Sequence, residues 1–228
     1  MRENQAKHRQ LAKERVKAER KRATRRESGS SLLVCEGECT EPFYLHGLLQ
    51  HLGINAASVE IIEGQSNSNA VAVVNRARQR FEQISRDRVF VLVDAEQSDL
   101  AQALKLCKVP LQRANKKKGL PKICIEPIIS TPCFEVWLLL HFRYCDQTFT
   151  RFSDVLPELQ AILPDYHKAD PRIFMTVGGG EGLERAMLHA ARLRAALAQT
   201  GSNSPATDMD RLVEALRAIA PPDQKRHQ

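Results

Sequence analysis

Short apolar runs that end in acidic residues recur along the chain. The run 31–35 is followed at once by Glu36, and the run 89–93 is followed by Asp94 and Glu96. Continuous runs of this kind, rich in Val, Leu and Ile, are typical of parallel strands that are buried on both faces. Two further runs complete the set of predicted strands, at 58–62 and 122–129.

Segments with apolar residues three or four positions apart lie between and after these runs and predict helices. The first helix has Thr40 as its N-cap and Pro42 in its first turn, and it ends at Gly53. Another, capped by Ser130-Thr131-Pro132, is apolar almost all round and therefore belongs in the core. The remaining predicted helices are Val74 to Ile84, one from Ser98, 152–163, 183–197, and 211–219 with Thr207 as N-cap. We predict an α/β fold, a mostly parallel sheet flanked by helices, with a helical C-terminal part.

Charge divides the chain into two parts. The net charge of +7 over 228 residues suggests a polyanionic partner such as nucleic acid, and much of the excess lies in residues 1–30. We therefore predict a basic N-terminal arm, 1–30, and a domain, 31–228. The arm is poor in large apolar residues, so it is a solvated helix or a disordered segment, and it serves either solubility or phosphate binding. A second basic run, Lys116 to Lys118, is either a solvated surface or a nucleic-acid contact.

The apolar stretches and the cysteines indicate in which cellular compartment the protein is found. No apolar stretch approaches the roughly 20 residues needed to cross a bilayer, and the N-terminus lacks the apolar segment of a signal peptide. Most of the six cysteines lie inside apolar runs, and none forms a C-x2-C pair. We therefore expect a soluble cytoplasmic protein whose thiols are buried, in preference to disulfides or zinc ligands.

The acids after two of the strands predict a metal site. If the strands are neighbours, Glu36 lies near Asp94 and Glu96, and three ionised carboxylates so close together need a compensating cation. Oxygen ligands suit Mg²⁺ or Mn²⁺, which support hydrolysis of phosphodiester bonds. In the alternative, Asp94 and Glu96 merely begin a loop, and Glu36 accepts amide hydrogen bonds in a turn with Gly37.

A fourth acid, Glu135, lies in the first turn of the apolar helix. A buried carboxylate there must be paired, neutralised or bound to a metal, because a lone buried charge is too costly. It could equally be a simple partner of the helix dipole. The residues alone leave both readings open.

Two motifs carry a family resemblance. Val34-Cys35-Glu36-Gly37 with Thr40-Glu41, followed by Asp94-x-Glu96 after an apolar strand, resembles the Toprim signature of topoisomerases, primases and OLD-type nucleases. The segment from Ser130 to Phe142 and the segment Asn203-Ser204-Pro205-Ala206-Thr207 resemble the RloB family. That family is found with restriction-modification loci and is paired with an ATPase in abortive-infection systems. The resemblance extends from about Leu32 to Leu216.

The resemblance implies a Toprim-like core in which Glu36, Asp94 and Glu96 bind Mg²⁺ or Mn²⁺. It adds Glu135 and Lys168, the latter stabilising phosphate charge, to a catalytic set of Glu36, Asp94, Glu96, Glu135 and Lys168. The family's acidic pair is D-x-D, whereas this chain has Asp94-Ala95-Glu96, whose second acid reaches one methylene further. Glu41 takes the place of the second acid of the Toprim pattern, or it is a first-turn carboxylate favoured by the helix dipole. Glu38 is predicted to face solvent.

The resemblance thus implies a metal-dependent Toprim nuclease acting on DNA or RNA, with tRNA among the candidate substrates, in antiphage defence with a separate AAA/ABC-type ATPase. The alternative is a non-catalytic nucleic-acid-binding or regulatory subunit. A topoisomerase is disfavoured because the tyrosines lack supporting context. ATPase activity in this chain is disfavoured because Gly178-Gly179-Gly180 lacks the G-K-[ST] ending of a phosphate-binding loop, so we interpret it as a turn.

Overall fold

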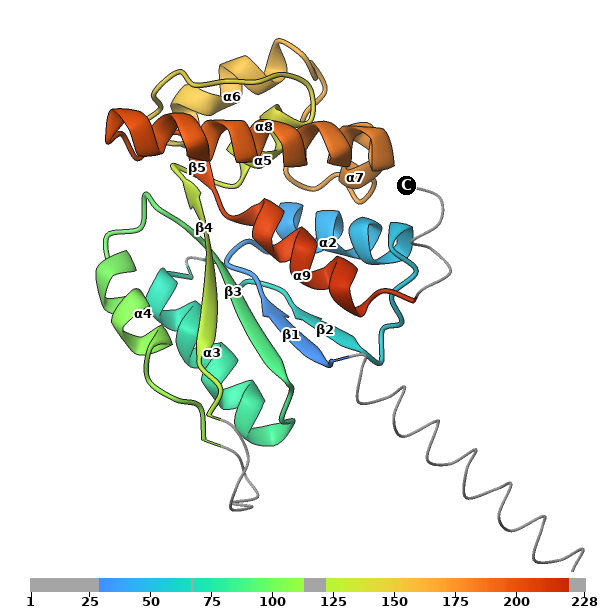
Figure 1. The fold of residues 1–228 in the computed structure, drawn as a ribbon, viewed down its shortest axis with the longest axis vertical. Coiled ribbons are helices and arrows are strands. Elements are labelled where there is room, and N and C mark those ends of the chain that lie inside the picture. Colours follow the sequence, from blue (N-terminus) through green and yellow to red (C-terminus); the bar gives the residue numbers. More distant parts are fainter. Residues whose placement is uncertain (1–28, 67, 113–121, 222–228) are drawn as a thin grey trace, which may run out of the picture.

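A five-stranded sheet forms the centre of the molecule in a computed structural model that describes residues 29–66, 68–112 and 122–221 (Figure 1). The strand order is β2-β1-β3-β4-β5. The first four strands are parallel, and β5 pairs antiparallel with β4. The strands are β1 (Ser31–Val34), β2 (Val59–Ile62), β3 (Arg88–Asp94), β4 (Ile125–Thr131) and β5 (Ala206–Thr207). This confirms the α/β fold with a mostly parallel sheet.

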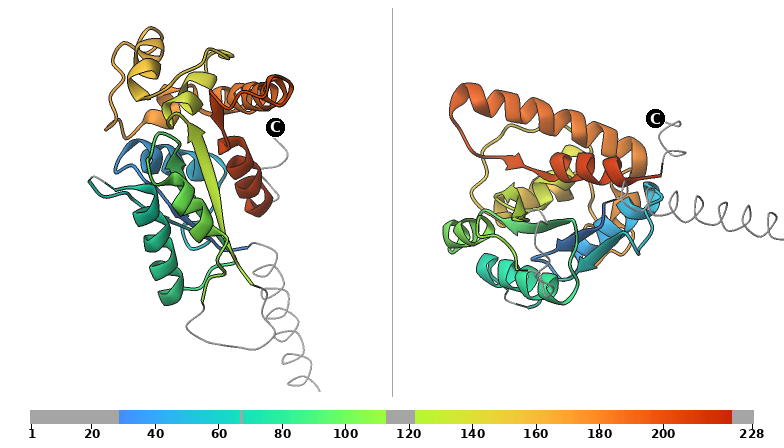
Figure 2. Two further views of the ribbon diagram at one scale, coloured as in Figure 1. Left: turned by 90° about the vertical axis from the view of Figure 1, so that its left-hand side faces the viewer. Right: turned by 60° about the horizontal axis from the view of Figure 1, so that its bottom comes forward.

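Helices cover both faces of the sheet. They are α2 (Thr40–His51), α3 (Ala70–Gln83), α4 (Leu100–Cys107), α5 (Glu135–Leu140), α6 (Phe152–Gln160), α7 (Ile173–Thr176), α8 (Gly179–Thr200) and α9 (Met209–Ile219). The right-hand view of Figure 2 shows α3 and α4 on one side of the sheet and α9 on the other. In Figure 1, α6 and α8 lie beyond the end of β4. The carboxyl end of the parallel sheet therefore faces a helical layer.

Alternation along the strands explains these two faces. Leu32 and Val34 pack with α3 and α4, whereas Leu33 and Cys35 pack in the cluster that contains α2, α5, α8 and α9. Successive side chains of a strand point to opposite faces, so a run that is apolar at every position can be buried on both. The apolar helix α5 is buried along its whole length, as predicted.

Three predicted helix caps are wrong. Ser130 and Thr131 belong to β4, and Phe134 is the N-cap of α5. Ser130 pairs with Asp94 on one side and with Thr207 on the other. Its backbone is therefore part of the sheet and does not lie at the start of a helix. Cys39 is the N-cap of α2. Thr40 is the first helical residue, and its hydroxyl donates to the carbonyl of Lys168 at 2.9 Å.

The third wrong cap is Thr207, which lies in β5, while Asp208 is the N-cap of α9. The glycine segment also differs from the predicted turn, because Gly179 and Gly180 are the first residues of α8. Gly178 is the N-cap, with φ of 99° in the left-handed region that favours glycine. A Cβ at Gly180 would lie 2.6 Å from the ring of the exposed His51 side chain, so the start of α8 lies close to the end of α2.

Other predictions have mixed outcomes. Cys35, Cys107, Cys133 and Cys145 are buried free thiols, whereas Cys39 is half-buried and Cys124 is exposed. No helix in the described part of the chain is both long and apolar enough to cross a membrane. The basic arm lies outside the described residues except for Gly29 and Ser30, and Lys116 to Lys118 lie within the undescribed segment 113–121.

Candidate functional site

A pocket of about 440 Å³ opens at the carboxyl ends of β1 and β3. Because these strands are direct neighbours, the residues that follow them meet at one edge of the sheet. Every predicted site residue lines this pocket: Glu36, Asp94, Glu96, Glu135 and Lys168. Glu41 and Glu38 line it as well, so six carboxylates and one lysine share one cavity.

Glu36 follows β1 and is held by the turn that follows β3. Its Oε2 accepts the backbone N–H of Asp94 at 3.1 Å, and its Oε1 accepts a hydrogen bond from the side-chain amide of Gln97. Burial raises the pKa of Glu36 above its usual value, although these two hydrogen bonds act in the opposite direction. The structure therefore brings Glu36 and Asp94 together, and Glu36 does accept the amide hydrogen bond that the alternative reading expected, from Asp94 in place of Gly37.

Asp94 is the last residue of β3 and carries the strongest sign of unmet charge. Its Oδ1 is buried and has no hydrogen-bond partner among the described residues. Burial raises its pKa well above the usual value, and the nearby carboxylates of Glu41, Glu135 and Glu36 raise it further. A buried polar atom without a partner is costly, so this oxygen is the natural point of attachment for a ligand of positive charge.

Glu41 has a larger part in the site than the sequence indicated. It lies in the first turn of α2, is only 4% exposed, and accepts the backbone N–H of Gly37 at 2.8 Å. Burial raises its pKa to about 8 despite this hydrogen bond, and the charges of Glu36 and Glu135 also raise it. Glu38, in contrast, is exposed as predicted, and it accepts the hydroxyl of Ser66 at 2.6 Å.

Glu135 is paired by two residues of the segment before α7. The hydroxyl of Tyr166 donates to its Oε1 at 2.9 Å, and the Lys168 Nζ lies 3.5 Å from the same oxygen. The carboxylate is 2% exposed, so these partners supply the compensation that a buried acid requires. The lysine side chain is 58% exposed and faces the pocket, where a substrate anion can compete for it.

Glu96 lines the pocket with the other acids and also contacts the start of α6. Its Oε2 accepts the backbone N–H of Phe152, the first residue of α6, at 3.0 Å. Lys168 Nζ lies 4.0 Å from the centre of the Phe152 ring. This chain has a glutamate where the family's D-x-D pattern has its second aspartate. The longer side chain of Glu96 contacts the N-terminus of α6, where negative charge is favoured.

The donor set fits a hard divalent cation in its chemistry. Carboxylate oxygens are the ligands that Mg²⁺ and Mn²⁺ prefer, and Asp94 Oδ1 is free to accept one. Within residues 29–66, 68–112 and 122–221, no three His, Cys, Asp or Glu side chains converge closely enough to hold an ion. Glu96 is held by the backbone N–H of Phe152, so an ion bound by all three acids requires rotation of the Glu96 side chain.

Two contacting residues were missed by sequence reasoning. Gln97 donates its side-chain amide to Glu36. Gly64, in the loop after β2, donates its N–H to the Gly37 carbonyl at 2.9 Å. A Cβ at Gly64 would lie 1.8 Å from the Glu36 carbonyl oxygen, so the loop after β2 closes directly on the turn that carries Glu36. No local pattern signals either contact, because both join segments far apart in sequence.

Comparison with known proteins places the chain in a family. A model of the family described as RloB-like protein matches residues 31–216 of the chain. No curated protein and no solved structure matches the chain. The matched region contains β1 to β5 and every residue that lines the pocket.

Proposed function

The chain belongs to the RloB-like family, and we propose that it is a Mg²⁺- or Mn²⁺-dependent nuclease that hydrolyses phosphodiester bonds in nucleic acid. The observation that carries the proposal is the pocket itself, where acids from the ends of β1 and β3 and from α2 and α5 surround a buried oxygen of Asp94 that has no hydrogen-bond partner among the described residues. Perturbed carboxylates gathered in one cleft are typical of functional sites. The net charge of +7 supports a polyanionic substrate.

Hydrolysis of a phosphodiester forms a bond between phosphorus and a water oxygen and breaks the bond to the leaving sugar oxygen. A bound divalent cation neutralises phosphate charge and activates water. Glu36 and Asp94 are the side chains that would hold it, and Glu36 would accept the proton of the attacking water. Lys168 would leave Glu135 to pair with a phosphate oxygen, which offers a stronger charge partner than its present contact at 3.5 Å.

The biological setting follows from the family resemblance. We propose that the protein acts in antiphage defence with a separate ATPase subunit, because the RloB family is associated with such systems. Nucleotide hydrolysis by the partner would then supply the control of cleavage. The cytoplasm, where phage nucleic acid and tRNA are found, is the matching location.

Cleavage assays test the nuclease proposal. Full-length protein, alone and with its partner ATPase, is incubated with plasmid DNA and with tRNA in Mg²⁺ or Mn²⁺. We expect cleavage that Glu36→Gln reduces by about 100-fold or more, since a general base contributes roughly that factor. Glu38→Gln is the matched control, because Glu38 lines the same pocket but is exposed, and it should retain activity. Equal cleavage by the parent and by Glu36→Gln would refute the proposal.

One observation favours a second candidate, a non-catalytic nucleic-acid-binding or regulatory subunit. The contact between Glu96 and the Phe152 N–H engages one oxygen of a carboxylate in the acidic pocket and gives that side chain a structural role. Such a protein would bind nucleic acid without binding Mn²⁺. Calorimetric titration with Mn²⁺ separates the two candidates, because heat of binding that disappears in Glu36→Ala supports the enzyme.

A further inference from the structure

The side chain of Gln97 holds Glu36 from a turn that is itself fixed. The backbone N–H of Gln97 donates to the Asp94 carbonyl at 3.3 Å, and its carbonyl accepts the N–H of Leu100 at 3.2 Å. These bonds join the end of β3 to the start of α4 and need nothing from the side chain. The half-buried amide nevertheless lines the acidic pocket and donates to Glu36 Oε1.

The same turn donates hydrogen bonds to both oxygens of the Glu36 carboxylate. The Asp94 N–H donates to Oε2 at 3.1 Å, and the Gln97 amide donates to Oε1. Two donors on two oxygens fix the plane of the carboxylate as well as its position. This orientation sets Glu36 beside Asp94, whose Oδ1 is buried and has no partner in the described part of the chain.

We propose that Gln97 is a positioning residue that orients Glu36 to receive a divalent cation, an inference that rests on the proposed function. A carboxylate oxygen has two lone pairs, so Oε1 can keep the hydrogen bond from Gln97 while it binds a metal. Hydrogen bonds to ligating carboxylates fix their orientation and support metal affinity. Because glutamine is neutral, it holds the acid without supplying the positive charge that a cation must provide.

The choice of donor separates this acid from one that the fold uses only for stability. Glu60, at the other end of the sheet, receives its hydrogen bonds from Arg80 and Arg86, which neutralise it. An arginine in the place of Gln97 would fill the same hydrogen bond and would repel a metal ion. A neutral amide is the donor type that leaves the negative charge of Glu36 available.

Mn²⁺ titration by calorimetry tests the inference on full-length protein. Gln97→Met keeps the length of the side chain and removes the donor, and we expect it to weaken Mn²⁺ affinity by about 10- to 100-fold. Gln65→Met is the matched control, since Gln65 lines the same pocket and has no side-chain hydrogen bond within the described residues. The control should bind Mn²⁺ within about twofold of the parent, because it removes no outer-shell contact.

A charge-exchange variant, Glu36→Gln with Gln97→Glu, guards against simple misfolding. It keeps the net charge and both hydrogen bonds but moves the negative charge from position 36 to position 97. We expect its thermal unfolding midpoint without metal to match that of the parent, while its Mn²⁺ affinity falls at least as far as in Gln97→Met. If Gln97→Met does not fold, Gln97→Asn takes its place, because it keeps a neutral amide that is one methylene too short for the contact with Glu36, and we expect it to weaken Mn²⁺ affinity in the same direction.

Each outcome has a distinct meaning. Parent-like Mn²⁺ affinity in Gln97→Met, or in Gln97→Asn where the former does not fold, would overturn the role of Gln97 and leave the nuclease proposal intact. No Mn²⁺ binding by the parent, with or without its nucleic-acid substrate, would overturn both. Weakened binding in Gln97→Met with an unchanged unfolding midpoint is the expected result, because a purely structural contact would lower the midpoint and leave the affinity unchanged.

Discussion

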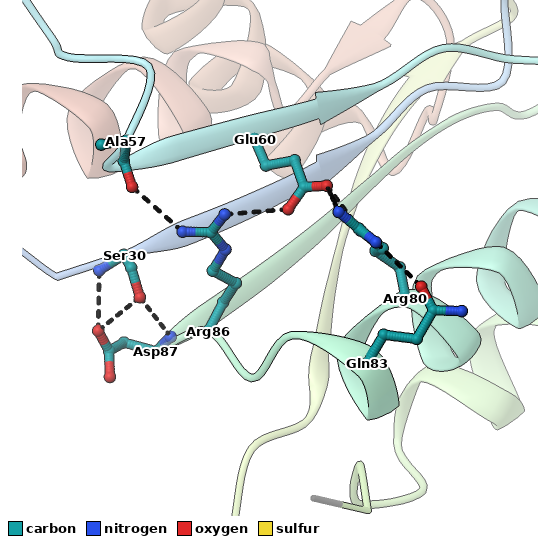
Figure 3. A network of polar contacts seen from close by, with 7 residues as sticks. All are labelled: Ser30, Ala57, Glu60, Arg80, Gln83, Arg86 and Asp87. Atoms are coloured by element: carbon teal, nitrogen blue, oxygen red, sulfur yellow. Dashed lines mark hydrogen bonds and ion pairs between the residues drawn. The ribbon is translucent and has the colours of Figure 1, made fainter. Parts of the chain in front are cut away.

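Acidic residues at the two ends of the sheet differ in their charge partners and in the direction of their pKa shifts. At the amino end, Glu60 lies between two arginines, with Arg80 at 2.6 Å and Arg86 at 3.0 Å (Figure 3). Burial would raise its pKa, but the hydrogen bonds from Arg86 and Arg80 outweigh burial and lower it. At the carboxyl end, the pKa of Glu36, Asp94 and Glu41 is raised, by burial first and then by the neighbouring acids.

The contrast separates charge that stabilises the fold from charge that is kept for function. The amino end is neutralised by the chain itself, since Arg88 pairs with Glu126 at 2.6 Å and Ser30 donates twice to Asp87. The carboxyl end has more carboxylates than cations among the residues that line its pocket, and Asp94 Oδ1 has no hydrogen-bond partner in the part of the chain that the structure describes. A protein tolerates such an arrangement where a ligand supplies the missing positive charge.

Asp94→Asn should have the largest effect on activity among the variants that distinguish the two ends of the sheet. We expect activity to fall by about 100-fold or more, the loss typical of removing one electrostatic contact to a transition state. The metal-free protein should nevertheless become more stable, with an unfolding midpoint higher by at least about 2 °C, because a repelled acid is replaced by a neutral amide.

Glu60→Gln is the matched opposite in the same experiment. It should leave activity unchanged and lower the midpoint by about 2 °C, since it weakens hydrogen bonds to two arginines. Calorimetric or fluorescence melting curves in a chelator measure both midpoints. Midpoint shifts of the same sign in the two variants would contradict the distinction between the two ends of the sheet.

Gly64→Ala should disturb the carboxyl end through the backbone. The new Cβ would lie 1.8 Å from the Glu36 carbonyl oxygen, so the turn that carries Glu36 must move. We expect Mn²⁺ affinity to fall, and the free energy of unfolding to fall by about 1–3 kcal/mol, the usual cost of overpacking.

Gly29→Ala is the control at the amino end, where the nearest atom to a new Cβ lies at 3.8 Å. Its Mn²⁺ affinity and unfolding free energy should match those of the parent. Titration calorimetry and urea unfolding give the two quantities. Parent-like Mn²⁺ affinity in Gly64→Ala would show that the position of Glu36 tolerates displacement.

The pH dependence of the free energy of unfolding should show a smaller effect of the acids at the carboxyl end of the sheet. A carboxyl whose pKa is raised on folding contributes stability that is fully present below its unfolded pKa and is lost as pH rises through its folded pKa. For Glu41 the folded value is about 8, so metal-free stability should fall as pH rises from about 4.5 to about 8.

Glu41→Gln should flatten this decline, because the replaced group no longer titrates. Added Mn²⁺ should restore stability at pH 8, where the carboxylates are ionised and bind a cation best. Urea unfolding at several pH values, with chelator or with Mn²⁺, measures the change. A decline of the same slope in Glu41→Gln would assign it to other groups.

Much of the fold followed from local patterns. Apolar runs with β-branched residues gave β1 and β3, and amphipathic spacing gave α2 and α3, because burial of apolar side chains dominates both choices. The ends were less predictable. Ser130 has the chemistry of a cap, yet it lies in β4 because partners on both sides offer backbone hydrogen bonds. The strand β5 has only two residues, too few to leave a pattern.

The sequence by itself determined that acids would lie at the carboxyl ends of β1 and β3, because strand burial forces charged residues to the ends of apolar runs. Tertiary structure decided which of them act together. It buried Glu41, paired Glu135 with Lys168, turned Glu96 towards α6 and placed Gln97 on Glu36. The physical reason is that hydrogen bonds and charge interactions act over a few ångströms in space, and a linear pattern does not encode distances between remote segments.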